Sequence, residues 1–179
     1  MASLPSSPRL TFRLWSEDDL PLAEALWCDP EVMRYLGDTM SREQAQARLR
    51  LEMERARLLG VQYWPIFAGA TNEFAGCAGL RPYRDEPGVF EVGVHIMRCF
   101  WSERLGEEAA RAVIQFAFDD LNANSLTAGH NPDNQHSKAL LARLGFTYSH
   151  LEPWGPLQID HLFYRLQPPV KAQRPGLDV

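Results

Sequence analysis

Two titratable side chains, Glu91 and His95, lie in segment 89–97, whose density of β-branched residues predicts a strand. A glutamate that points into a cleft can have a raised pKa and accept a proton near neutral pH, as a general base must. His95 lies on the same strand and could contact a substrate instead. A structural role is the alternative for each residue. The segment therefore indicates acid–base chemistry.

A second stretch with a distinctive spacing runs from Asn131 to Phe146, where a polar turn feeds a short apolar-faced helix. Asn134 can cap this helix by accepting a hydrogen bond from a free backbone N–H. Gly145 is suited to the left-handed conformation that ends helices. The leucines 140, 141 and 144 give the helix one apolar side. The pattern predicts a capped helix that leads into a strand.

The spacing N-x-x-S-x-x-x-L-x-x-L-G-F in this stretch also resembles motif B of the GNAT acyl-CoA acetyltransferase superfamily. In that family the turn and helix line one side of the pantetheine arm of acetyl-CoA. The resemblance implies that Asn134 binds this arm and that Ser137 contacts the cofactor near the helix start. The alternative is a surface turn that caps a core helix.

The start of the chain, Leu10–Leu20 followed by Asp29–Leu36, is similar to a GNAT subgroup that includes ribosomal-protein N-terminal (alanine) acetyltransferases. From this likeness we expect the cleft for the acetyl acceptor to be walled by aromatic and apolar side chains. These are Met33, Tyr35, Tyr83 and the loop at Trp154. Ordinary packing is the alternative for each of them.

The loop expected to hold pyrophosphate aligns the GNAT pattern Q/R-x-x-G-x-G/A with Trp101–Gly106. Helix N-termini bind anions through free N–H groups and the positive end of the helix dipole. Gly106 fits the last glycine, Trp101 replaces the first polar residue, and Arg104 stands at the middle glycine. The Arg104 side chain could crowd the pyrophosphate or form a salt bridge with it. Backbone donors from Arg104 to Glu108, among them those of Leu105, Gly106 and Glu107, would serve in either case.

The family resemblance also assigns chemistry to segment 89–97, because in GNAT proteins this strand splays from its neighbour. Backbone N–H groups from about Val94 to Ile96 would then polarise the thioester carbonyl, and Gly93 is consistent with a bulge. The place of Glu91 in E-x-G-x-x-I resembles that of a glutamate in the subgroup. We therefore predict that Glu91 is the general base and that it acts through water. Leu141 stands where many members have a tyrosine acid. A thiol with a pKa near 8.5 can leave unaided.

Composition limits the class of protein. The chain has 179 residues, of which 45% are hydrophobic and 11% aromatic, as expected for one domain with a full core. A net charge of −5 disfavours a general nucleic-acid surface. Three widely spaced cysteines and no signal peptide indicate reduced thiols in a cytoplasm. The five histidines show no metal-ligand spacing, so we expect no metal, and no apolar run is long enough for a membrane span.

Hydrophobic periodicity predicts the elements that position these residues. Strands are expected at Leu10–Trp15, Val61–Ala68, Phe74–Leu80, Val89–Met97, Ser125–Ala128, Phe146–His150 and Gln158–Leu166. Helices are expected to begin at Ser16, Pro30, Ser41, Arg104 and Asn134, and Pro153–Pro156 is expected to join the last two strands. The order matches the α/β (α+β) GNAT fold, with a mixed, mostly antiparallel sheet of about six to seven strands and about four flanking helices. We expect one domain over residues 9–167, with flexible termini at 1–8 and 168–179.

The resemblance thus implies a cytoplasmic, acetyl-CoA-dependent N-acetyltransferase in which a primary amine attacks directly in a ternary complex. The acceptor would be a small-molecule amine or a protein N-terminus. No nucleic acid or membrane partner is expected, and a homodimer is compatible with the family. The alternative, which Arg104 and Leu141 favour, is a GNAT-fold CoA-binding or regulatory module without turnover.

Overall fold

The computed structural model describes residues 4–155 and 158–169. They form one seven-stranded sheet in the order β1-β2-β3-β4-β5-β7-β6, in which only β4 and β5 run parallel. The strands are β1 Leu10–Phe12, β2 Tyr63–Ala68, β3 Glu73–Pro82, β4 Val89–Ile96, β5 Ser125–His130, β6 Thr147–Trp154 and β7 Ile159–Leu166. The helices are α1 Leu20–Trp27, α2 Pro30–Met33, α3 Arg42–Leu59, α4 Leu105–Asp119 and α5 Gln135–Arg143, with 3₁₀ turns at Glu17–Asp19 and Arg98–Glu103. This is the expected mixed, mostly antiparallel sheet with flanking helices.

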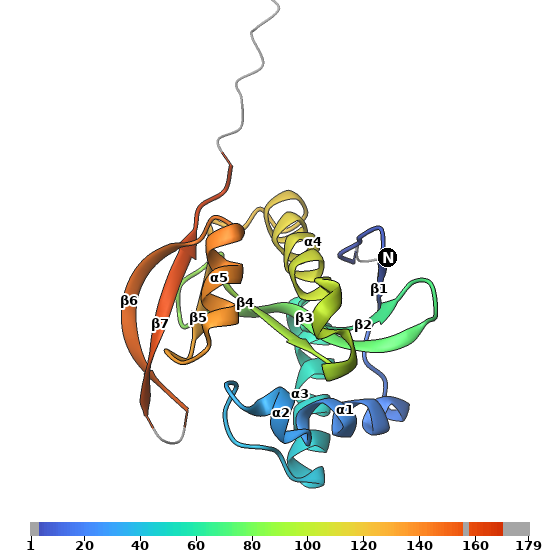
Figure 1. Ribbon diagram of the computed structural model, residues 1–179. Coiled ribbons are helices and arrows are strands. Elements are labelled where there is room, and N and C mark those ends of the chain that lie inside the picture. The colour runs from blue at the N-terminus through green and yellow to red at the C-terminus, as the bar shows by residue number, and fades with distance from the viewer. Residues whose placement is uncertain (1–3, 156–157, 170–179) are drawn as a thin grey trace, which may run out of the picture.

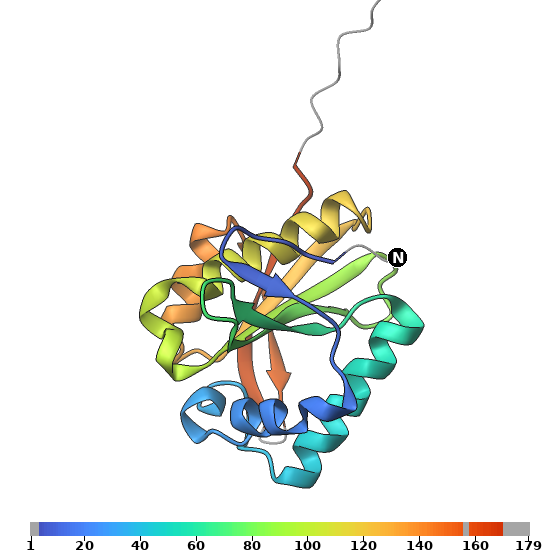
Figure 2. The same cartoon turned by 90° about the vertical axis from the view of Figure 1, so that its right-hand side faces the viewer.

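The helices form two layers on opposite sides of the sheet (Figure 1). One layer holds α4 and α5, whose buried side chains join the larger hydrophobic core. The other layer holds α1, α2 and α3, which pack around Trp15, Trp27 and Tyr63. Figure 2 shows the central strands lying between α4 and this second layer. A ligand that passes between two strands would therefore touch both layers.

The predicted helix ends are set by local hydrogen bonds. Ser41 and Gln44 form a capping box, in which the Ser41 N–H donates to Gln44 Oε1 at 2.7 Å. The Ser137 N–H donates to Asn134 Oδ1 at 3.0 Å, which confirms the predicted cap of α5. Gly145 has the predicted left-handed conformation, with φ +85°. These short-range signals place α5 correctly.

Three details differ from the sequence-based expectations. Strand β1 ends at Phe12 rather than Trp15, because the next partner on β2 is Pro65, which has no N–H to continue the ladder. Strand β6 runs through Pro153 and Trp154, which were expected in a loop; β6 is an edge strand, where proline is tolerated. The rest of that expected connection, residues 156–157, lies outside the described residues.

The third difference concerns Gly93, which forms no bulge. The pairing of β3 with β4 is unbroken and sets Gly79 opposite Gly93. A Cβ at position 93 would overlap the Tyr63 hydroxyl and ring, so the close approach of this ring requires glycine.

The described residues contain no helix that is both long and apolar enough to cross a bilayer. Within the same ranges no group of three or more His, Cys, Asp or Glu side chains could hold a metal ion. The expected termini lie partly in segments 1–3 and 170–179, outside the described residues.

Candidate functional site

Strands β4 and β5 separate shortly after they meet. Their parallel pairing covers only Val89–Glu91 against Ser125–Thr127. The Met97 N–H donates to the Ala75 C=O at 2.9 Å, so in this ladder the odd-numbered amides of β4 point to β3. The amides of Val94 and Ile96 therefore point toward β5, beyond the last paired residues. This is the splay expected from the sequence, and it leaves backbone donors facing an opening in the sheet.

A cleft passes through this opening and reaches both helical layers. On one side it is lined by the start and inner face of α5 together with Ala110 of α4; on the other side it is lined by the segment after α2, by α3 and by β6 and β7. Its lining includes Met33, Tyr35, Leu36, Met40, Arg48, Tyr63, Arg81, Glu91, Gly93, Val94, His95, His130, Asn134, Ser137, Leu141, Trp154, His161 and Phe163. One continuous cavity thus joins Glu91, Val94, His95, Asn134 and Ser137 to three of the expected wall residues, whereas Ile96 and the predicted cofactor residues between Trp101 and Glu107 do not line it.

The side chains of β4 divide between the two layers. Val94 and Ile96 pack with the larger core, and a Cβ on Gly106 would meet Ile96 Cγ1 at 3.3 Å. Glu91 and His95 alternate with them and face the layer of α1–α3. The proton-handling residues and the predicted cofactor residues therefore lie on opposite faces of the same strand.

The start of α4 has the unsatisfied donors of an anion site. The first N–H groups of a helix have no intrahelical acceptor, and the residue before Leu105 provides no side-chain cap. That residue, Arg104, has φ +58° and ψ +21°, the left-handed conformation in which the expected glycine is favoured. Its exposed guanidinium has no partner among the described residues. The backbone thus keeps the expected geometry although the glycine is absent.

Glu107 and Trp101 hold the surroundings of this helix start. The Glu107 carboxylate bonds Arg111 and Arg143, each at 2.8 Å, and hydrogen bonds from Arg111 and then Arg143 lower its pKa. It links α4 to the end of α5, so only its backbone N–H is available to a cofactor. The Trp101 indole N–H donates to the Ile96 C=O at 2.8 Å while the ring is 53% exposed.

Asn134 and Ser137 line the cleft at the start of α5. The Asn134 side-chain oxygen is used by the helix cap. Its amide nitrogen and the Ser137 hydroxyl have no hydrogen-bond partner within residues 4–155 and 158–169 and can bond a ligand. Leu141, which stands where the resemblance would place a tyrosine acid, is 7% exposed and supplies only an apolar wall.

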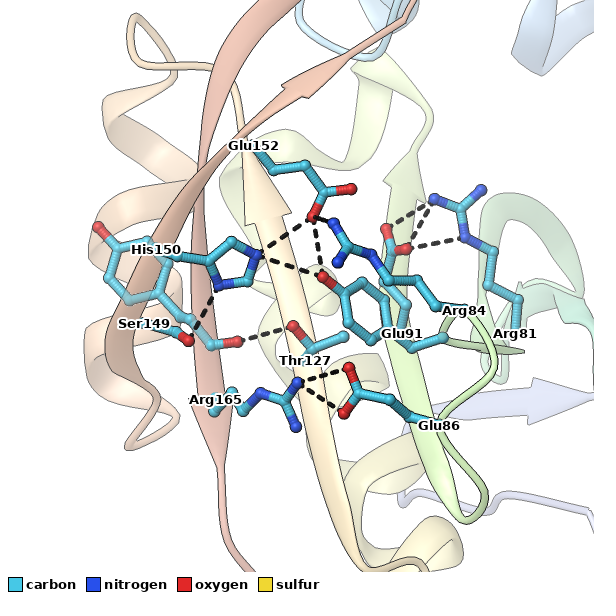
Figure 3. Close-up of polar contacts among 11 residues, drawn as sticks. Arg81, Arg84, Glu86, Glu91, Thr127, Ser149, His150, Glu152 and Arg165 are labelled. Atoms are coloured by element: carbon cyan, nitrogen blue, oxygen red, sulfur yellow. Dashed lines mark hydrogen bonds and ion pairs between the residues drawn. The ribbon is translucent and has the colours of Figure 1, made fainter.

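Glu91 forms a bidentate ion pair with Arg81, its cross-strand partner on β3 (Figure 3). The Arg81 Nη2 lies 2.7 Å from Glu91 Oε1, and Nε lies 3.0 Å from Oε2. Both carboxylate oxygens are therefore occupied, and a water that receives a proton must share Glu91 with the guanidinium.

His95 is fixed by Trp27 of α1, whose indole N–H donates to His95 Nδ1 at 3.1 Å. Burial, followed by the charges of Arg48 and Arg81, lowers the His95 pKa to about 3. The neutral ring must then carry its proton on Nε2, since an indole can only donate. His95 therefore presents an N–H donor to the cleft, which suits the predicted contact with a substrate better than acceptance of a proton.

The structure adds two histidines that the sequence interpretation missed. His161 lines the cleft, stacks on Trp154 at 4.8 Å, and has its pKa lowered by burial and then by His130. His130 uses both ring nitrogens, one on the Asn131 C=O at 2.7 Å and one on the Tyr164 hydroxyl at 3.3 Å. His161 is therefore the histidine with the less engaged ring. In the sequence, its place two residues before Phe163 on the last strand was the only indication that it would face the cleft.

Three of the four expected wall residues line the cleft, namely Met33, Tyr35 and Trp154. Tyr83 does not line it. Its ring packs on Phe163, and its hydroxyl donates to Glu152 at 2.8 Å. Burial, followed by this hydrogen bond, raises the Tyr83 pKa to about 12. Tyr83 thus belongs to a polar cluster that ties the β3–β4 connection to β6.

Comparison with known proteins gives consistent results. A family model described as acetyltransferase (GNAT) domain matches residues 9–147. The chain is 31% identical over 140 residues to a Bacillus licheniformis protein named uncharacterized N-acetyltransferase p20, covering 77% of this chain and 79% of that protein. It resembles the structure of a GNAT-family acetyltransferase from Bacillus anthracis with a TM-score of 0.79 and 18% identity, covering 92% and 98% of the two chains. It also resembles RimL, a ribosomal L7/L12 alpha-N-protein acetyltransferase solved with coenzyme A, with a TM-score of 0.78, 17% identity, and 92% and 97% coverage.

Proposed function

The chain belongs to the GNAT acetyltransferase family, and from this premise we propose that it transfers an acetyl group from acetyl-CoA to a primary amine. Acetyl transfer is the activity of the family. The amine acceptor, the direct attack and the roles of individual residues are the proposal. The observation that carries it is the cleft at the β4–β5 splay, which joins free backbone donors to proton-handling side chains.

The residues on the α4–α5 side fit acetyl-CoA. The uncapped start of α4 offers the N–H groups of Leu105, Gly106 and Glu107 to a pyrophosphate. Arg104 directly precedes these donors, so its free guanidinium would add a charge-assisted hydrogen bond to the pyrophosphate. The Asn134 amide and the Ser137 hydroxyl would bond the pantetheine arm. Bound there, acetyl-CoA supplies an activated acyl group as a thioester.

Catalysis needs the attacking amine to be neutral and the thioester carbonyl to be polarised. The Val94 N–H, which has no strand partner toward β5, would polarise the carbonyl oxygen. Glu91 would receive the amine proton through water, and His161 is the other proton acceptor on the same side of the sheet. His95 and Tyr63 would orient the acceptor by hydrogen bonds.

Departure of the thiol would need no acid at position 141. Leu141 closes that side of the cleft with an apolar surface. A thiol is a good enough leaving group at neutral pH to depart without a partner. The lack of an acidic group at position 141 therefore does not favour a module without turnover.

The acceptor proposed from the subgroup resemblance is a protein N-terminus or a small amine, with RimL as a structural neighbour whose name states such a reaction. Free thiols at Cys28, Cys77 and Cys99 fit a cytoplasmic enzyme. A homodimer is also proposed, from the subgroup resemblance alone.

The test is thiol release from acetyl-CoA in the presence of a panel of amines that includes N-terminal peptides, amino acids, polyamines and aminoglycosides. We expect amine-dependent release with at least one class. Tight CoA binding without amine-dependent release across the panel would favour the module without turnover.

A further inference from the structure

Arg48 of α3 reaches the acceptor side of the cleft with a guanidinium that is only partly used. Its Nε donates to Glu52 Oε1 at 2.7 Å. Neither terminal nitrogen has a hydrogen-bond acceptor within the described residues, and Nη2 is buried in that state. An unsatisfied buried donor is costly, so such groups often mark a place where a ligand binds.

The position of this guanidinium is fixed by its surroundings. Its central carbon lies 5.4 Å from the Trp27 ring and 5.3 Å from the Tyr63 ring. Glu52 is fully buried and also accepts from Arg55 at 3.0 Å and from the Tyr63 N–H at 2.8 Å. Arg48 is therefore held by an ion pair and two aromatic faces while the edge formed by Nη1 and Nη2 stays unpaired.

The groups next to this edge are hydrogen-bond donors. His95 presents Nε2–H, because Trp27 occupies its Nδ1. The Tyr63 hydroxyl lies against Gly93, and burial raises the Tyr63 pKa, which keeps it protonated. Glu91 is the only acidic residue among the described cleft-lining residues, and Arg81 occupies both its oxygens. The cleft has no free carboxylate for a polycation.

We propose that the acceptor carries a carboxylate beside its amine and that the free edge of Arg48 binds this carboxylate. The proposal rests on the proposed N-acetyltransferase function and names its substrate class: amino-acid-like amines with an apolar side chain. A guanidinium edge matches a carboxylate in a two-bonded geometry. The apolar side chain would lie against Met33, Leu36 and Met40.

A binding experiment on the protein without cofactor tests the recognition independently of turnover. The probes are N-acetyl-L-phenylalanine and its amide, which differ only in the carboxylate, measured by calorimetry with wild type, Arg48→Met and Arg55→Met. Arg55 shares Glu52 with Arg48 but does not line the cleft, so it is the matched control. We expect the acid to bind wild type and Arg55→Met about 10–100-fold more tightly than the amide, as for a charged hydrogen-bonded pair. In Arg48→Met this ratio should fall to about 1.

Arg48→Lys keeps the charge without the planar edge and should give an intermediate ratio, which also covers a failure of Arg48→Met to fold. Equal binding of acid and amide to wild type, or binding of neither probe, would overturn the proposal. In a parallel assay of thiol release, a preference for polyamines over L-phenylalanine would overturn the substrate class while supporting N-acetyl transfer. Thiol release that does not depend on any added amine would instead count against the proposed function.

Discussion

At the scale of single residues, the ion pair between Arg81 and Glu91 is compatible with two roles for the glutamate, which a variant can distinguish. A base that acts through water must keep a charged oxygen available, whereas a positioning residue needs only to hold Arg81. We expect Glu91→Gln to retain CoA affinity and to lower kcat by about 10²–10⁴-fold, as for a lost general base. The loss should shrink as pH rises, because more of the amine is then already neutral. A pH profile of kcat measures this.

Two further variants identify the proton acceptor. Arg81→Met removes the ion pair and leaves the carboxylate, so it should cost less turnover than Glu91→Gln. His161→Gln should have the smaller effect on the pH profile. Near-normal turnover of Glu91→Gln at pH 7 together with a large loss in His161→Gln would assign the proton to His161.

The local features of the cleft could be predicted from the sequence, whereas the contacts between residues far apart in the chain could not. Asn134 and its cap are local, three residues apart, and could be predicted from spacing alone. The partner of His95 lies 68 residues away, and the partner of Glu91 depends on the register between β3 and β4. Such long-range contacts decide which nitrogen carries a proton, and no local pattern encodes them.

At the scale of elements, the start of α4 carries backbone strain that can be separated from charge. An arginine in the left-handed backbone conformation has a higher conformational free energy than a glycine in the same conformation. Arg104→Gly should therefore raise the free energy of unfolding without ligand by up to about 1 kcal/mol, less the entropy that glycine adds to the unfolded chain. It should also weaken CoA binding by about 10-fold if the guanidinium pairs with pyrophosphate.

Arg104→Ala is the control, since it removes the charge but keeps the strain. It should weaken CoA equally and bring no gain in stability. Tighter CoA binding in both variants would show that the side chain crowds the phosphate. A large side chain at Gly106 would be a poorer test, because it would press on Ile96 and separate α4 from β4.

The cluster at Glu152 gives a pH-dependent prediction for the contact between the β3–β4 connection and β6. Burial raises the Glu152 pKa, but bonds from Arg84, Tyr83 and His150 outweigh it and lower the pKa from 4.5 to about 2. Because the folded pKa is the lower one, the carboxylate stabilises the fold above pH 4.5, and this is lost as pH falls toward about 2. Glu152→Gln should cost about 1–2 kcal/mol at pH 7, allowing for solvent screening.

Urea unfolding at pH 7 and pH 3 measures this difference, which should be smaller at pH 3. Glu73→Gln, which removes a carboxylate at an exposed position of β3 outside this cluster, is the control. An equal cost of Glu152→Gln at both pH values would show that the carboxylate contributes through packing rather than charge.

Element types were more predictable than element ends. Alternation and caps identified every strand and α-helix of the described residues, whereas Pro65 shortened β1 and the edge position of β6 allowed Pro153 into a strand. Both exceptions depend on the neighbours of a strand in the sheet. The 3₁₀ turn Arg98–Glu103 before α4 was also not predicted.

At the scale of the whole molecule, a ligand in the cleft would connect the two halves of the sheet. Acetyl-CoA at about 100 times its dissociation constant should add about 2.7 kcal/mol to the free energy of unfolding. For a chain of this size that corresponds to a rise in Tm of roughly 5–10 °C. Thermal unfolding with millimolar acetyl-CoA checks this, and an unchanged Tm would speak against cofactor binding.

The splay also means that successive backbone amides of β4 differ in whether they are hydrogen-bonded within the sheet or open to water. The amides of Gly93 and His95 point to β3, whereas those of Val94 and Ile96 point into the opening. In deuterated solvent, neighbouring amides should therefore exchange at alternately slow and fast rates. Occupation of the cleft would slow the fast pair and leave the slow pair unchanged. Amide-resolved exchange by NMR would then reveal, one proton at a time, which backbone groups meet the bound molecule.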